Sequence, residues 1–146
     1  MLRRLFGKEK TRDDKLTEAI RVITGLLDNQ ASFAQMQNLS MKDEQGNLKR
    51  KALGYVYGYI DCALRAWGLD MKDMDVGPPV TFHVLRRLWP EHHAEYMDFL
   101  AKNISHDPIL AVGVLNGGQQ FLDYVVHEKV PNGIPMGLVL YMLDGD

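Results

Sequence analysis

The apolar residues of this sequence recur at steps of three and four, and no long run alternates strictly between apolar and polar residues. Between residues 15 and 36, one face carries Leu16, Ala19, Ile20, Ile23, Leu27 and Ala34. A helical turn of about 3.6 residues brings such positions onto one side, whereas a half-buried strand shows alternation. The pattern therefore predicts an all-α protein.

Five further segments have helical spacing, and capping residues or prolines mark several of their ends. They span residues 47–69, 80–88, 90–102, 108–129 and 135–143. Asn47 is a suitable N-cap for the first of these segments, and Asp107 with Pro108 marks the start of the fourth. The adjacent residues Gly117 and Gly118 leave two possibilities, one long helix or a break at that point.

Chain length and connection length define the expected architecture. A chain of 146 residues has the size of one domain. Short connections place consecutive long helices mostly antiparallel. We therefore expect residues 11–146 to form a single-domain irregular bundle of five to six helices.

Residues 1–10, MLRRLFGKEK, are expected to form a flexible basic and apolar segment. Leu2, Leu5 and Phe6 lie among basic residues at helix-like spacing, so weak peripheral contact with an anionic membrane surface is an alternative. No stretch of the sequence reaches the ~18 to 20 apolar residues of a transmembrane helix, so no transmembrane segment is predicted.

The charge balance and the cysteine content limit the choice of partner and compartment. The chain has 17 basic and 19 acidic side chains, and its formal net charge is -2. Such a charge does not attract nucleic acid, so no sequence-specific nucleic-acid partner is predicted. Cys62 is the single cysteine and has no internal disulfide partner, which favours a reducing compartment and a cytoplasmic location.

The familiar catalytic and phosphate-binding motifs do not occur in the sequence. It contains no glycine-rich phosphate loop, no GxSxG elbow, no HExxH motif, and no glutamate followed by histidine three residues later. The single cysteine excludes a zinc ribbon. These absences favour a non-catalytic protein, and no cofactor is predicted.

Two pairs of side chains have the spacing of metal ligands on one helix face. Asp123 and His127 are four residues apart, and His92 and Glu95 are three apart. Each pair supplies two ligands, whereas a protein site for zinc needs at least three. A divalent metal at these residues is one hypothesis, and ordinary hydrogen bonding at a solvated surface is the other.

A basic cluster at the start of the second predicted helix is a candidate ligand-binding site. It contains Asn47, Lys49, Arg50 and Lys51. Cations are unfavourable at this end of the helix dipole, and the first-turn N–H groups are free. The cluster therefore predicts binding of an anion such as phosphate, with a solvated basic patch as the alternative.

Asp61 lies in the most apolar helical segment, and Arg65 follows it four residues later. A buried unpaired carboxylate is costly, so the two side chains are predicted to form a buried or half-buried pair that contributes about 2 to 4 kcal/mol. The pair is also a candidate ligand contact in an internal pocket.

Two pairs of glycines are spaced so that each leaves a strip of helix without side chains. Gly54 and Gly58 are four residues apart, as are Gly113 and Gly117. Such strips allow two helices to approach more closely than the usual ~8 to 10 Å between axes. We predict that at least one strip is buried against another helix, within the subunit or across a two-fold axis.

The functional hypothesis follows from the broad apolar surfaces of two predicted helices, residues 47–69 and 108–129. Such helices need cover from other helices or from a partner. Together with the missing motifs, this favours a non-catalytic cytoplasmic protein that acts by oligomerisation, for example as a homodimer, or by binding a protein partner. The alternative is a small-molecule or metal-dependent enzyme with a pocket between helices.

Overall fold

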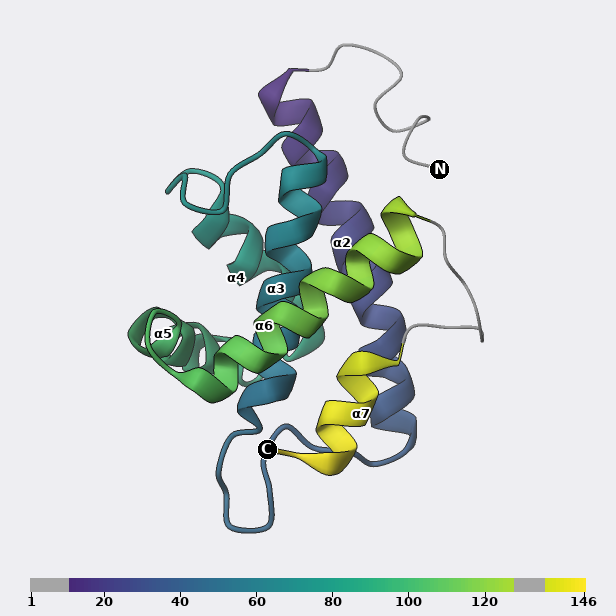
Figure 1. The fold of residues 1–146 in the computed structure, drawn as a ribbon, viewed down its shortest axis with the longest axis vertical. Coiled ribbons are helices and arrows are strands. Elements are labelled where there is room, and N and C mark those ends of the chain that lie inside the picture. The colour runs from purple at the N-terminus through teal and green to yellow at the C-terminus, as the bar shows by residue number, and fades with distance from the viewer. Residues whose placement is uncertain (1–10, 128–135) are drawn as a thin grey trace.

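The computed structural model describes residues 11–127 and 136–146 and confirms the all-α fold (Figure 1). Its elements are α2 (Arg12–Met36), α3 (Arg50–Ala66), α4 (Gly77–Leu88), α5 (His93–Asn103), α6 (Pro108–Phe121), the π-helical turn η1 (Leu122–Val126) and α7 (Gly137–Asp144). These two ranges contain six α-helices and no β-strand. The expectations for residues 1–10, 128–129 and Pro135 lie outside the described residues.

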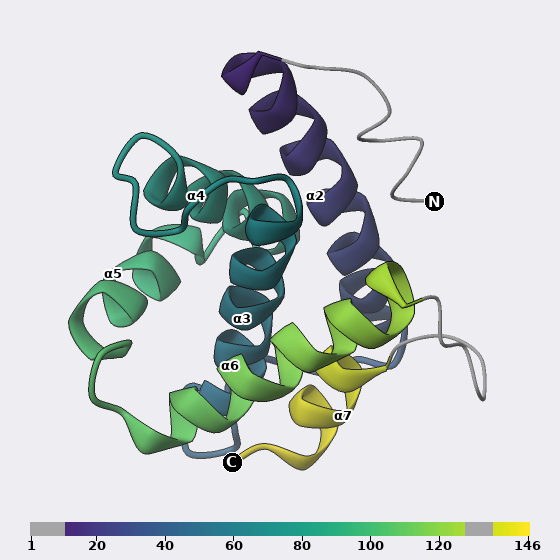
Figure 2. The same cartoon turned by 45° about the horizontal axis from the view of Figure 1, so that its top comes forward.

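Helix α3 is the central element of the fold. Its side chains Tyr55, Ile60 and Leu64 are completely buried. Helices α2, α4, α6 and α7 all pack against α3, which Figure 2 shows in the middle of the arrangement. One hydrophobic core extends from Ala19 on α2 to Met142 on α7. The expectation that this helix is covered on nearly every side is confirmed.

Helices α3 and α6 cross with their backbones in direct contact. A Cβ atom added at Gly58 would overlap a backbone carbonyl of α6, and one added at Gly117 would overlap a backbone carbonyl of α3. Gly54 and Gly113 make the same close approach one turn earlier. The prediction that a glycine strip is buried is therefore confirmed, and the two strips face each other within one subunit.

The two crossing helices run in the same general direction. Gly54 faces Leu110, and Gly58 faces Val114, so the facing positions advance together along both chains. The bundle is thus not built from antiparallel pairs alone. Helices α4 and α5 bring the chain back to the N-terminal end of α3, where α6 begins (Figures 1 and 2). As a result, the N-terminal ends of α3 and α6 lie side by side.

Four helix starts differ by about three residues from the expected positions. Helix α2 begins at Arg12, before the expected residue 15, and α5 begins at His93, after the expected residue 90. Helix α3 begins after Lys49 and not after Asn47, because the backbone N–H of Asn47 donates to a side-chain oxygen of Asp43 in the preceding turn. Helix α4 begins at Gly77, three residues earlier than expected. Its two prolines occupy the first turn. Backbone N–H groups of the first turn have no acceptor within the helix, so proline, which lacks an N–H, costs no hydrogen bond there.

The adjacent residues Gly117 and Gly118 do not break α6. The helix continues to Phe121 and then widens into the π-helical turn η1. There the N–H of His127 donates to the carbonyl of Leu122, five residues earlier, at 2.8 Å. Of the two possibilities left by the sequence, the continuous helix is correct, and the π-helical turn was not predicted.

A buried polar network connects α7 to the rest of the fold. The side chain of Gln30 donates to the hydroxyl of Tyr55 at 3.0 Å, and that hydroxyl donates to the side-chain carbonyl of Gln120. The N–H of Gly137 donates to Gln120 at 3.2 Å, and the N–H of Leu138 donates to Gln30 at 3.0 Å. Helix α7 has no side-chain cap of its own, so these two glutamines satisfy N–H groups of its first turn.

The close helix crossing makes Gly58 intolerant of any side chain. We expect Gly58→Ala to lower the free energy of unfolding by at least about 3 kcal/mol, because the new methyl group forces the two backbones apart. Chemical denaturation followed by circular dichroism measures this change.

The matched control is Gly25→Ala on α2, where an added Cβ would meet nothing within 4 Å. This variant should gain about 0.5 to 1 kcal/mol from the better helix propensity of alanine. Equal stability of Gly58→Ala and the unmodified chain would contradict the close crossing.

Candidate functional site

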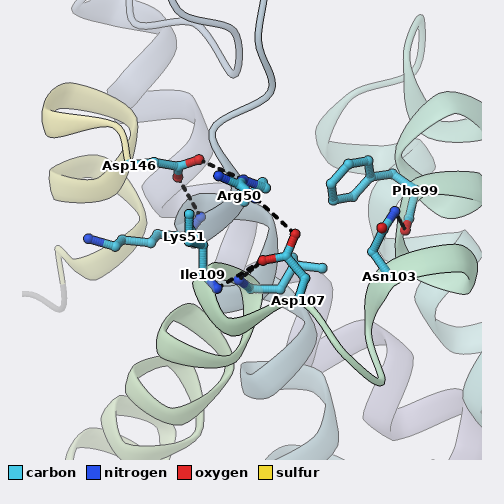
Figure 3. A network of polar contacts seen from close by, with 8 residues as sticks. Arg50, Lys51, Phe99, Asn103, Asp107, Ile109 and Asp146 are labelled. Atoms are coloured by element: carbon cyan, nitrogen blue, oxygen red, sulfur yellow. Dashed lines mark hydrogen bonds and ion pairs between the residues drawn. The ribbon is translucent and has the colours of Figure 1, made fainter.

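A polar cavity of about 570 Å³ lies at the N-terminal ends of α3 and α6, with Arg50 in its wall (Figure 3). The Nε of Arg50 donates to Asp146 at 3.1 Å, and its Nη1 donates to Asp107 at 3.0 Å. Asp107 also accepts the N–H of Ile109 at 2.8 Å, and Asp146 accepts the N–H of Lys51 at 3.0 Å. Each carboxylate therefore joins the guanidinium group to the first turn of a helix.

These contacts shift the pKa values of the charged groups. The hydrogen bond to Asp146 is the largest cause that raises the pKa of Arg50, and partial burial opposes it. Burial alone would raise the pKa of Asp107. Hydrogen bonds from the N–H of Leu110 and from Arg50 outweigh burial, so the pKa of Asp107 lies below its ordinary value. Both groups are therefore charged at neutral pH.

The structure places a carboxylate of the chain itself where the sequence predicts an anion. Asp146 binds the guanidinium of Arg50 and the backbone N–H of Lys51. The ammonium of Lys49 donates to a backbone carbonyl of α7, and Asn47 belongs to the preceding turn. Binding of an external phosphate at this position stays a prediction, because such an anion must compete with Asp146.

The residues predicted as metal ligands have other partners. Asp123 accepts a hydrogen bond from Gln119, one turn earlier, at 3.0 Å. Asp123 lies in η1 and His127 follows it, and the described residues show no ion pair between the two. His92 lies 3.8 Å from Glu95, whose carboxylate also pairs with a lysine. In the part of the chain that the structure describes, no three His, Cys, Asp or Glu side chains gather in a way that could hold a metal ion. Metal binding stays a hypothesis that lacks a third ligand.

Asp61 and Arg65 meet, as predicted, but they meet at the protein surface. The Nη2 of Arg65 lies 3.2 Å from a carboxylate oxygen of Asp61. The Asp61 side chain is half-buried, with 22% of its surface exposed, whereas the Arg65 side chain is 72% exposed. A fully buried pair is therefore wrong, and the half-buried alternative holds for Asp61 alone. An exposed pair at this spacing contributes about 0.3 to 0.5 kcal/mol, because water screens the charges. Binding of a ligand by this pair stays a prediction, and neither residue lines the methionine-containing, polar or other cavities described for residues 11–127 and 136–146.

A second cavity, of about 310 Å³, is lined mainly by apolar side chains and was missed at the sequence level. Met71 and Met74 come from the connection before α4, Met97 comes from α5, and Tyr57 comes from α3. The hydroxyl of Thr81 is already bonded to a backbone carbonyl at 2.8 Å. Because four separate segments build these walls, no local pattern reveals them. The one sequence signal was the content of eight methionines.

Buried titratable groups in the fold are held in their neutral forms. Burial, assisted by the charge of Glu95, raises the pKa of Tyr96 to about 12. Burial and the neighbouring charge of Asp61 raise the pKa of the Cys62 thiol. A thiol with a raised pKa is a poor nucleophile at neutral pH, so Cys62 has a packing role.

Comparison with known proteins finds no family model, no curated protein and no solved structure that matches this chain. None of the helices in the two described ranges has both the length and the apolar character needed to cross a membrane.

The lowered pKa of Asp107 predicts a specific dependence of stability on pH. Its ionised form contributes stability above the unfolded-state pKa of about 3.9, and this contribution is lost as the pH falls through the lower folded-state pKa. In the unmodified chain, the free energy of unfolding should fall below about pH 4 as Asp107 takes up a proton. In Asp107→Asn, whose side chain does not titrate, this fall should be smaller. Urea denaturation between neutral and acidic pH measures this slope.

The control for this measurement is Asp98→Asn, which removes an exposed carboxylate that pairs with Lys102 at 2.9 Å. It should leave the acid slope nearly unchanged, because solvent screens that pair. An acid slope in Asp107→Asn equal to that of the unmodified chain would contradict the role of Asp107.

Proposed function

We propose that this protein is a non-catalytic helical protein that binds a partner polypeptide, and that the methionine-lined cavity holds an apolar side chain of that partner. The observation that carries the proposal is the apolar cavity of about 310 Å³ with methionines on two of its walls. This volume is at the lower end of the range for ligand pockets. The cavity walls offer no arrangement of groups for acid–base or nucleophilic chemistry.

Methionine side chains suit this kind of recognition. They are unbranched and polarisable, so they adapt to different apolar groups. Met74 is 76% exposed at the edge of the cavity, where it is accessible to an incoming chain. A partner that covers Met74 removes apolar surface from water, which supplies the driving force for binding.

The charge around the cavity favours a basic partner. The connection that carries Met71 and Met74 also carries three acidic residues and one basic residue, Asp70, Lys72, Asp73 and Asp75. Asp73 pairs with Arg12, and the remaining charges leave the connection acidic. Opposite charges at the rim of an interface increase the association rate and the specificity. We therefore propose an amphipathic segment with apolar and basic side chains as the occupant, in the manner of a helix that lays its apolar face into a groove.

A synthetic amphipathic helix of leucine and lysine is a suitable probe for this proposal. We expect calorimetry to detect its binding. We expect Met74→Lys to weaken the affinity at least about tenfold, because an ammonium group at the cavity edge resists desolvation and repels the lysines of the probe. Met36→Lys is the matched control, because Met36 is 77% exposed and lies at the end of α2, outside the cavity.

Three results would contradict the proposal. The first is no binding of the peptide, and the second is an equal loss of affinity in the Met74 and Met36 variants. The third is binding of a small apolar dye that the peptide does not displace, which would assign the cavity to a small molecule.

A second copy of the chain is a further candidate partner, and a separate apolar surface on α6 and α7 supports it. The two helices contact each other and lie on the same side of the molecule (Figure 1). Leu115 is 73% exposed and Leu143 is 60% exposed. The other large exposed apolar residues of these helices are Val112 and Leu140. A homodimer through this surface would cover all four side chains.

Native mass measurement tests the dimer. We expect the unmodified chain to have the mass of two subunits and the double variant Leu115→Asp/Leu143→Asp to have the mass of one, because buried unpaired carboxylates disfavour the interface. A single-subunit mass for the unmodified chain at micromolar concentration would exclude a stable homodimer.

We also propose a cytoplasmic location. The proposal is supported by Cys62, a free cysteine that is partly buried, because reducing compartments preserve free thiols.

A further inference from the structure

Gly25 is a glycine that packing within the chain does not explain. It lies in the middle of α2, where glycine weakens a helix relative to alanine. A Cβ added there would meet nothing within 4 Å, and its φ is not positive. Every other glycine in the described ranges either has a positive φ or would place a Cβ against neighbouring atoms. The space above Gly25 is open to solvent, and any side chain at this position would occupy it.

Gly25 belongs to the wall of a groove of about 380 Å³ between α2 and α4. Arg21 and Asp28 lie one turn before and one turn after it on α2, and His83 and Arg87 lie one turn apart on α4. Residues at these spacings share a helix face, so the two rows of side chains point into the same groove. The remaining lining residues are Ile20 and Thr24.

Several polar groups in the groove have no partner within the described chain. The Thr24 hydroxyl is shielded from solvent and has no hydrogen-bond partner. Arg21 and His83 line the groove without an ion pair to any described residue. Arg87 lies 3.5 Å from Asp28, which is too long for a direct hydrogen bond of good geometry. Two guanidinium groups face one carboxylate, so the groove carries a net positive charge.

The geometry points to a binding site for a phosphomonoester in the groove between α2 and α4, with Arg21, Arg87, His83 and Thr24 around the phosphate and the rest of the ligand over Gly25. Guanidinium groups bind phosphate through two parallel hydrogen bonds. The imidazole and the hydroxyl supply further donors.

A phosphomonoester suits this set of donors better than a carboxylate does. It has three free oxygens and about -1.5 to -2 charge at neutral pH, whereas a carboxylate has two oxygens and a single charge. The second arginine and the Thr24 hydroxyl would lack an acceptor if a carboxylate were bound. The site is separate from the methionine-lined cavity and does not depend on the proposed partner binding.

Phenyl phosphate is a suitable probe, because it combines a phosphomonoester with a flat apolar group. We expect calorimetry to show binding that weakens as the salt concentration rises. Arg21→Gln and Arg87→Gln should each weaken the affinity by about tenfold, since each removes a charge-assisted contact. Vesicles with and without phosphatidic acid form a second arm, which distinguishes a lipid headgroup from a free ligand.

Gly25→Leu separates the binding role of Gly25 from any structural role. The open space at this position accepts the new side chain, so the melting temperature should not fall, while the leucine fills the groove and abolishes phosphate binding. Thr17→Leu, at an exposed position two turns earlier on α2, is the control and should bind as the unmodified chain does.

The outcomes of this experiment are distinct. Loss of phenyl phosphate binding in Gly25→Leu supports a site for a free phosphomonoester. If the unmodified chain binds phosphatidic acid vesicles but not phenyl phosphate, and Gly25→Leu loses the vesicle binding, the same site takes a lipid headgroup as its ligand. Absence of binding in both arms, or unchanged binding in Gly25→Leu, would overturn the proposal.

Discussion

The direct contact between the backbones of α3 and α6 determines how the other helices are placed. Because Gly58 and Gly117 remove the side chains from the crossing, α6 lies directly on the central helix and not one side-chain layer away. This proximity lets the Tyr55 hydroxyl reach Gln120 on α6 while it also bonds Gln30 on α2. Helix α7 is then held by N–H groups that donate to these two glutamines, so the crossing fixes α7 as well.

The same crossing explains the charges at one end of the molecule. Parallel helices bring two positive dipole ends together, and at this end the chain also carries Arg50 beside two lysines. Positive charge of this density needs compensation. Asp107 caps α6 and pairs with Arg50, and Asp146 accepts the N–H of Lys51 and pairs with the same guanidinium (Figure 3). The cluster read from the sequence as an anion site is thus held together by anions of the chain itself.

Features that depend on local spacing could be predicted, and features that depend on distant segments could not. The glycine strips and the Asp107 cap follow from residues within one or two turns of each other. The contact between Asp146 and the N–H of Lys51 joins residues 95 positions apart, so no spacing rule reveals it. The start of α3 was displaced for a related reason, because Asn47 is drawn into a turn by Asp43. The burial of the Asp61 pair is also a tertiary property: the apolar neighbours in sequence indicate the half-buried Asp61, but they do not indicate that the Arg65 side chain extends into solvent.

Helix α4 has a different relation to each candidate binding site. Gly77, Pro78 and Thr81 line the methionine cavity, whereas His83 and Arg87 line the groove beside α2. With about 3.6 residues per turn, these two sets lie on opposite faces of the helix. A substitution in one set therefore leaves the other face intact, provided that α4 itself stays folded. Met74 and Gly25 lie outside α4 altogether, so changes at these two positions alter one site each without disturbing the helix that both sites share.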